Sequence, residues 1–245
     1  MKHFDIISIF PRALDSYFNE SILKRAQEKK LIKISTHDLR KYTTDKHHKV
    51  DDRVYGGGAG MVMKVEPIYR ALKALLRHSP LATRHSQKVR TILLAANGKM
   101  FTQKDAVRLS KYDRLVFICG RYEGVDARVE KFIDEKISIG AYVLTGGELP
   151  AAIIIDAVSR NIPRVVGKEE SVQNESYSQA VRKAGRKNLM TLSLHDSLPY
   201  LEHDQYTRPE VFEVGKKKLK VPKVLLSGDH KSIIDWKNKN SNNSQ

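Results

Sequence analysis

The chain has 245 residues, and 40% of them are hydrophobic, which is enough for a substantial core in one large domain or two modest ones. Its 44 Lys and Arg against 28 Asp and Glu give a net charge of +16. This charge favours a protein that binds a polyanion such as nucleic acid over a basic protein that has no such partner. The single cysteine, Cys119, excludes an internal disulfide and fits a reducing cytosol, while charged N-terminal residues and the short apolar run at 149–155 argue against a signal peptide and a membrane span.

Apolar runs alternate with helical patterns over the first 160 residues. The apolar runs predict strands at residues 3–10, 31–36, 89–96, 113–120 and 136–144. The helical patterns predict helices at residues 11–27, around 67–76, after Thr102, through 129–132, and at 148–160. Thr102 is the expected N-cap of its helix, with Asp105 in the first turn. Since the strands are apolar throughout, we expect an α/β fold with a mostly parallel sheet covered on both faces.

The pattern changes after residue 160, which predicts a second part of the chain. We expect a first domain at residues 1–165, a polar linker at 166–205 and a small, mainly helical C-terminal domain at 206–245. In the last of these, Ser227 or Asp229 is placed to cap a short helix, and the polar tail is expected to be disordered.

A long polar loop at residues 37–60 ends in the glycine-rich stretch YGGGAG, residues 55–60. The stretch does not match a phosphate loop, because Met61 follows where Lys and Ser or Thr are required. It also fails the dinucleotide-binding pattern, which needs another glycine at that point. A surface turn and a charged, glycine-hinged lid or RNA-contacting segment both remain open, and the neighbouring DKHHKVDDR favours the second.

Three further glycine-bearing segments follow predicted strands: LAANGK, CGRYEGVD and SIGAYVLTGGELP. Because parallel strands end at the same edge of a sheet, these segments can converge on one pocket. None has the lysine and hydroxyl residue of a phosphate loop, so a backbone-lined pocket for an uncharged group such as adenosine is favoured. For CGRYEGVD, a simple turn with a surface Arg–Glu pair is an equally good interpretation.

Other candidate groups carry weaker signals. Cys119 follows an apolar run and is interpreted as a buried small residue, not as a nucleophile. The nine histidines have no metal-ligand spacing, so no metal site is predicted. The basic run GKKKLKVPK near Trp236 suits phosphate contacts but is equally typical of a solvated surface.

Several long motifs together resemble one known family. KHHKVDDRVYGGGAGMVM, CGRYEGVDARV, SIGAYVLTGGELPA, IDAVSRNIP, YTRPEVF and VPKVLLSGDH occur in the order found in the bacterial tRNA (guanine-N1)-methyltransferases, the TrmD family of the SPOUT class. The resemblance covers residues 1 to about 236. It implies a sheet with a deep trefoil knot, which periodicity would not predict because threaded chains are rare, and an obligate homodimer in the cytoplasm.

The resemblance also implies a reaction and a cofactor. Such an enzyme takes a methyl group from S-adenosyl-L-methionine and places it on N1 of the guanosine immediately 3′ of the tRNA anticodon, position 37, when a guanosine precedes it. Activity in the family is linked to magnesium, so Mg²⁺ is a further possible cofactor, and Glu123 serves the donor or that ion. By motif match, the residues that bind the methyl donor are Leu94, Ala95, Ala96, Gly98, Gly120, Tyr122, Glu123, Ile139, Gly140, Ala141, Tyr142, Val143, Leu144, Gly146, Gly147 and Pro150.

Two catalytic residues follow from the same resemblance. Glu175, in QNESY, is the expected general base for the N1 proton, and Arg160 is the expected cation beside O6. The chain departs from the family pattern at Glu175 and Ala141, where aspartate is usual, and at Ala96, where proline is common. A non-catalytic RNA-binding protein of the same fold and a methyltransferase for another RNA are the alternatives, and donor binding separates the first of them from the enzyme.

Overall fold

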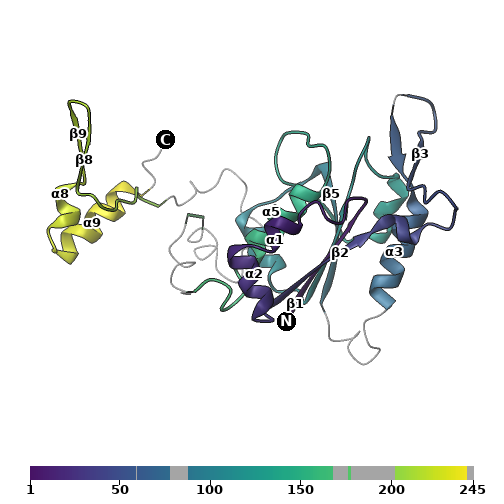
Figure 1. Ribbon diagram of the computed structural model, residues 1–245, viewed down its shortest axis with the longest axis horizontal. Coiled ribbons are helices and arrows are strands. Elements are labelled where there is room, and N and C mark those ends of the chain that lie inside the picture. The colour runs from purple at the N-terminus through teal and green to yellow at the C-terminus, as the bar shows by residue number, and fades with distance from the viewer. Residues whose placement is uncertain (59, 78–87, 168–175, 178–201, 242–245) are drawn as a thin grey trace. The chain divides into compact units, whose positions relative to one another are not determined.

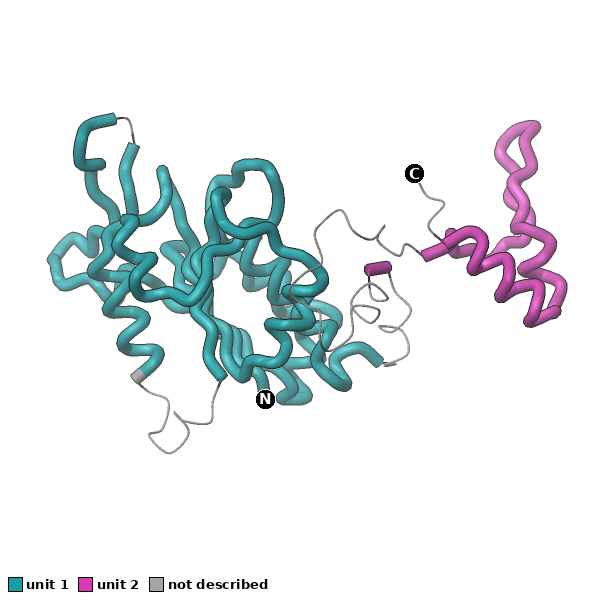
Figure 2. Tube along the Cα trace, turned by 180° about the vertical axis from the view of Figure 1, so that it is seen from behind, with its two compact units in different colours: residues 1–167 teal, residues 168–245 magenta. Residues whose placement is uncertain are grey.

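A computed structural model describes residues 1–58, 60–77, 88–167, 176–177 and 202–241. The chain divides into two compact units, residues 1–167 and 168–245, which Figure 2 shows in different colours. Each unit is considered by itself.

A five-stranded parallel sheet forms the centre of the first unit (Figure 1), which confirms the predicted α/β class. The strand order is β2-β1-β6-β5-β7, and every neighbouring pair is parallel. Its strands are β1 (Lys2–Ser8), β2 (Ile32–Asp38), β5 (Val89–Met100), β6 (Arg114–Cys119) and β7 (Glu135–Ser138).

Alternate residues of the central strands supply two separate cores, one on each face of the sheet. One core contains Phe4, Leu94 and Phe117 and is completed by helices α1 (Asp15–Phe18), α2 (Ser21–Glu28), α4 (Gln103–Leu109) and α5 (Glu148–Ser159). The other contains Ile7, Leu93 and Ile118 and is completed by α3 (Val65–Arg77) and two short 3₁₀ helices. Because side chains alternate along a strand, a run that is apolar throughout feeds both cores, as the sequence predicts.

The elements between β1 and β5 differ in detail from the prediction. The single helix expected at 11–27 is wrong: the chain forms α1 (Asp15–Phe18) and α2 (Ser21–Glu28), with Asn19 and Glu20 between them. The segment expected to be a loop holds η1 (Leu39–Tyr42) and an antiparallel hairpin of β3 (Asp51–Arg53) and β4 (Met61–Met63). The helix predicted around 67–76 is α3 (Val65–Arg77).

The start of α4 (Gln103–Leu109) agrees with the sequence. Thr102 and Asp105 form the reciprocal hydrogen bonds of a capping box, which satisfy amide groups that a helix start leaves unpaired. At the other end, the buried Lys2 Nζ donates to the Leu109 carbonyl oxygen at 2.8 Å and to the Tyr112 carbonyl. Burial lowers the pKa of Lys2 to about 8, against a smaller opposing effect of Asp113.

The last elements of the unit lead to the cavity described below. Residues predicted as a helix after β6 form the 3₁₀ helix η2 (Ala127–Phe132). The predicted strand 136–144 is too long, since β7 ends at Ser138 and the chain continues as a loop to α5 (Glu148–Ser159). The apolar residues of that loop face a cavity, which explains why they read as part of a strand.

The second unit is small. It contains a hairpin that the sequence did not predict, β8 (Val211–Val214) with β9 (Lys217–Lys220), followed by α8 (Lys223–Leu226) and α9 (His230–Asn240). Of the two predicted caps, Asp229 is the one that caps α9. Within the described residues of the chain, no helix is both long and apolar enough to cross a membrane.

Candidate functional site

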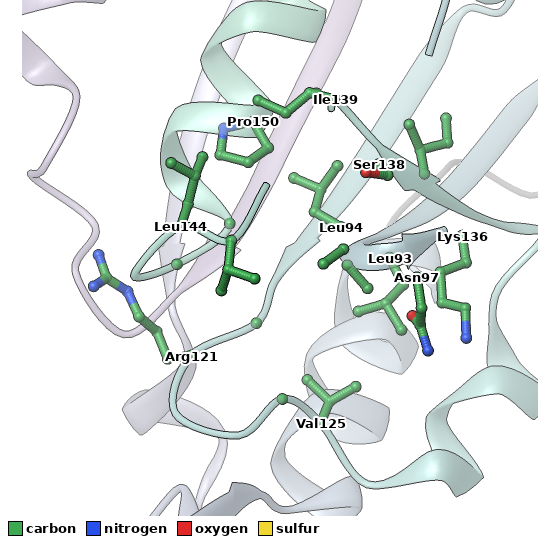
Figure 3. A pocket seen from close by; sticks show the side chains of 18 of the residues that line it. Leu93, Leu94, Asn97, Arg121, Val125, Lys136, Ser138, Ile139, Leu144 and Pro150 are labelled. Atoms are coloured by element: carbon green, nitrogen blue, oxygen red, sulfur yellow. The ribbon is translucent and has the colours of Figure 1, made fainter. Parts of the chain in front are cut away.

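A cavity of about 480 Å³ lies where β5, β6 and β7 end. Its walls are the segment after Leu93 in β5, the loop 120–125 after β6, and the loop 138–147 after β7 with the start of α5 (Figure 3). The three predicted glycine-bearing strand ends therefore meet at one place, because parallel strands present their carboxyl ends at one edge. The volume is within the usual range for a small-molecule site.

Most of the residues expected to bind the methyl donor line this cavity. They are Leu94, Ala95, Ala96, Gly120, Tyr122, Glu123, Ile139, Gly140, Tyr142, Val143, Leu144, Gly146, Gly147 and Pro150. Their convergence is an observation about position, and their contacts with a ligand remain a prediction.

Two of the expected donor-binding residues lie outside the cavity wall. Gly98 follows the register shift between Leu94 and Lys99, and its Cα packs against the backbone of Ile137, where a Cβ would be only 2.5 Å from a backbone carbon. Ala141 is in the loop after β7 but is not among the lining residues. The motif match placed both in the right loops, but it could not tell which backbone atoms face the cavity.

Of the two expected catalytic residues, Arg160 is not among those that line the cavity of this chain. Arg160 caps the C-terminal end of α5, and it is half-buried. Its position is ten residues beyond Pro150, or about 15 Å along the helix axis. Glu175 lies outside the described residues.

Apolar and polar groups occupy different parts of the cavity wall. Figure 3 places Leu94, Ile139, Leu144 and Pro150 around one part. Asn97 and Lys136 lie together at the opposite side from Arg121. Asn97 and Arg121 lie within the loops that the motif match assigned to the donor, whereas Leu93, Val125, Lys136 and Ser138 were not predicted as lining residues. Proximity to the strand ends was the only signal available for them.

The charges that line the cavity balance one another. Two cations, Arg121 and Lys136, and two carboxylates, Glu123 and Glu130, are among the described lining residues. Lys136 Nζ is 2.6 Å from Glu130 Oε1, and Arg121 is bound to the carboxylate of Glu148. Both cations are thus engaged by carboxylates, so the described wall has no excess positive charge to hold a phosphate.

Close backbone approach joins two walls of the cavity. The Gly147 amide donates to the Gly120 carbonyl oxygen at 2.9 Å, which links the loops after β6 and β7. A Cβ at Gly147 would lie 2.6 Å from the Cα of Cys119, so a side chain does not fit there without backbone movement. This observation explains the glycine at the end of the TGG motif.

The cysteine beside this contact is not suited to covalent chemistry. Cys119 is fully buried, and burial raises the pKa of its thiol well above the usual value, with a further increase from the nearby Glu148 carboxylate. Since the thiolate is the nucleophilic form, this thiol is expected to be inert, as the sequence indicated.

The glycine-rich stretch at 55–60 is connected to the cavity through the β3–β4 hairpin. Backbone hydrogen bonds join Glu123 to Met61 at 3.1 Å, and Met63 to Gly124 and Asp126 at 3.0 and 2.9 Å. At the hairpin tip, the Tyr55 side chain is 96% exposed. The hairpin that carries the stretch is therefore anchored through β4 on a wall of the cavity.

The described residues contain no group of three or more His, Cys, Asp and Glu side chains arranged to hold a metal ion. The wall instead offers backbone amides and carbonyls, apolar side chains and balanced charge. Such a wall can hold a neutral, partly aromatic group such as a nucleoside, whose polar edge needs amide partners and whose faces need apolar contact.

The fold and the cavity together define an α/β protein with a ligand site at the carboxyl edge of a parallel sheet. The family model described as tRNA (Guanine-1)-methyltransferase TrmD matches residues 1–245, and the chain belongs to this family. A protein of Carboxydothermus hydrogenoformans named tRNA (guanine-N(1)-)-methyltransferase is 46% identical over 97% of this chain and 81% of its own length. A protein of the same name from Dictyoglomus turgidum is 44% identical, over 98% of this chain and 84% of its own length.

Proposed function

We propose that the protein is a tRNA (guanine-N1)-methyltransferase that uses S-adenosyl-L-methionine and modifies the guanosine immediately 3′ of the anticodon, position 37, when a guanosine precedes it. Family membership supports the reaction class. The observation that carries the choice of cofactor is the charge-balanced cavity at the carboxyl ends of β5, β6 and β7, which suits an adenosine without phosphate.

The residues that would hold the donor are those of the three loops. The apolar group of Leu94, Ile139, Leu144 and Pro150 would contact the faces of the adenine, and loop backbone would meet its polar edge. Glu123, at the wall, would offer a carboxylate to the positively charged part of the donor or to Mg²⁺. When bound, the sulfonium supplies an electrophilic methyl group with a neutral thioether as leaving group.

The protein must then make guanine N1 nucleophilic. N1 carries a proton whose pKa is well above neutral, so a carboxylate has to remove it as the N–C bond forms. Glu175 is the proposed acceptor of this proton, and the Arg160 guanidinium would stabilise the negative charge that develops on O6. Glutamate is one methylene longer than the usual aspartate. The backbone at Glu175 must therefore lie about an ångström further from the guanine than an aspartate backbone would.

A homodimer would resolve the separation between the cavity and Arg160. About 15 Å of helix lies between Pro150 and Arg160 in one chain, so Arg160 is better placed to serve the cavity of a partner subunit. Exposed apolar side chains of α5 and the neighbouring loop, Leu149 and Ile153 with Phe10, offer a surface for that contact. A trefoil knot, in which the cavity loops are threaded, belongs to the same proposal.

The proposed substrate agrees with the charge of the chain. A net charge of +16 favours a nucleic acid, and the second unit presents the exposed lysine-rich hairpin of β8 and β9. We place the enzyme in the cytoplasm, where its tRNA substrate is made.

The decisive experiment compares two tRNA transcripts that differ only at the guanosine of position 37. With S-adenosyl-L-methionine present, nucleoside mass spectrometry should detect 1-methylguanosine in the transcript with guanosine and none in the transcript with adenosine. Methylation of both transcripts, or of neither, would contradict the proposal. Salt-sensitive tRNA binding without methylation, together with no binding of S-adenosyl-L-methionine, would instead favour the non-catalytic RNA-binding alternative.

A further inference from the structure

An ion pair between Arg121 and the buried Glu148 joins the loop after β6, which lines the cavity, to the start of α5. Glu148, in the first turn of α5, is 3% exposed, and its Oε2 accepts a hydrogen bond from Arg121 Nε at 3.0 Å and lies 2.9 Å from Arg121 Nη2 in an ion pair. Its other oxygen, Oε1, accepts from Ser8 Oγ at 2.5 Å. Each oxygen of the carboxylate therefore accepts a hydrogen bond, one from Ser8 and one from Arg121, and the ion pair with Arg121 offsets the cost of its burial.

Arg121 is held from several sides at once. Besides Glu148, its Nη1 donates to the Thr145 carbonyl oxygen at 3.1 Å, and its guanidinium lies 4.7 Å from the centre of the Phe10 ring. Its backbone amide contacts Met63 Sδ at 3.2 Å. One side chain thus links the loop after β6 to the loop after β7 and to the residues that follow β1.

Arg121 makes more contacts than an ordinary surface ion pair, in which a cation meets a single carboxylate. The planar fork of arginine reaches a carboxylate and a carbonyl oxygen together, whereas a lysine ammonium has neither the reach nor the geometry for both. The hydrogen bond from the Gly147 amide to the Gly120 carbonyl oxygen involves the residues next to this pair in the sequence. The side chain of Arg121 and the backbone of Gly147 therefore fix the same two walls relative to each other.

We propose that Arg121 and Glu148 act as a clasp that sets the spacing of the two cavity walls, and that this spacing determines affinity for the methyl donor. The inference rests on the proposed function for the identity of the ligand. Arg121 lines the cavity, but Glu148 does not, so Glu148 is a positioning residue that acts through Arg121. Its substitution should affect donor affinity without loss of any direct contact.

The test compares Arg121→Met and Glu148→Gln with Arg128→Met. Arg128 is a matched control, since it pairs with Asp126 at 2.6 Å on the neighbouring element but is 66% exposed and does not line the cavity. Calorimetric titration with S-adenosyl-L-homocysteine, the demethylated donor, should show Kd raised by about tenfold or more in both clasp variants and changed by less than about twofold in the control. Kinetically, KM for the donor should rise while KM for tRNA stays near that of the wild type.

A second readout does not depend on the donor. In the ligand-free protein, hydrogen exchange of the Gly147 amide should become faster in the clasp variants, while exchange in β1 and α4 stays unchanged. Ser8→Ala, which removes one donor and leaves the ion pair, should give a smaller effect of the same kind and serves if the larger changes impair folding.

Unchanged donor affinity in folded Glu148→Gln, or unchanged exchange at Gly147, would overturn the clasp. The failure of the proposed function would look different. In that case wild-type protein would not bind S-adenosyl-L-homocysteine at all, while the exchange experiment would still report on the ion pair.

Discussion

Replacing Gly147 by alanine should both destabilise the first unit and weaken donor binding. The added methyl group would lie 2.6 Å from the Cα of Cys119 and 3.0 Å from the amide nitrogen of Gly120, whereas ordinary contact begins at 3.4 Å. Both neighbours are backbone atoms, so no side chain can rotate away. One of the two cavity walls must therefore move by about 0.8 Å, in a region that is packed as densely as a protein core.

The magnitude follows from this forced movement. Overpacking of this kind costs about 1–3 kcal/mol. For a unit of this size, each kcal/mol corresponds to about 2–4 °C in the midpoint of thermal unfolding. Because a positioning error near 1 Å can cost up to about 10²-fold in a preorganised site, the Kd for S-adenosyl-L-homocysteine should rise by at least about tenfold.

The control and the assay are both simple. Gly167→Ala adds the same methyl group where no atom of the described residues lies within 4 Å and where the backbone is not in the left-handed region, so it should leave both quantities near the wild-type values. Thermal unfolding followed by circular dichroism and calorimetric titration would measure the two effects. If Gly147→Ala matched Gly167→Ala in both, the close contact between the loops would not govern the site.

Three further outcomes are expected. Glu175→Gln should lower kcat by about 10²–10⁴-fold, and Arg160→Ala should lower kcat as well, both with little change in the donor Kd. Single-turnover rates equal to those of the wild type would refute the roles of Glu175 as general base and of Arg160 as the cation at O6. Thr102→Ala should reduce the free energy of unfolding by about 0.5–2 kcal/mol, measured by denaturant titration, and no change would refute the cap. Since the pKa of Lys2 is lowered from 10.5 to about 8, the unfolded chain holds that proton more tightly, so the free energy of unfolding should rise between these pH values. The rise should disappear in Lys2→Met, and parallel pH profiles of the two proteins would contradict it.

The parallel sheet could be predicted because its strands are strongly apolar and each feeds a core on both faces. Thr102 could be assigned as a cap because capping depends on residues three positions apart. In contrast, the helical conformation is interrupted between α1 and α2 at Asn19 and Glu20. Neither residue is a glycine or a proline, so the sequence gives no clear signal for the interruption. The strands of the β3–β4 hairpin have three residues each, too few for a periodic pattern.

The cavity was predictable at the level of loops but not of individual side chains. Glycines next to apolar strands indicated where the backbone approaches a ligand or another loop. The pairing of Arg121 with Glu148 joins residues 27 positions apart, whereas CGRYEGVD alone was equally compatible with a ligand site and with a turn that holds a local Arg–Glu surface pair. In the structure Arg121 turns to a carboxylate of α5, because the fold brings the two strand ends together.

The proposed function depends most on a cavity that accepts an adenosine-type donor without a phosphate. Titration of the purified chain with S-adenosyl-L-methionine and, separately, with ATP tests this requirement directly. Saturable binding of one S-adenosyl-L-methionine for each cavity, with no measurable binding of ATP, is the predicted result. Preferential binding of ATP, or no binding of S-adenosyl-L-methionine, would contradict the account.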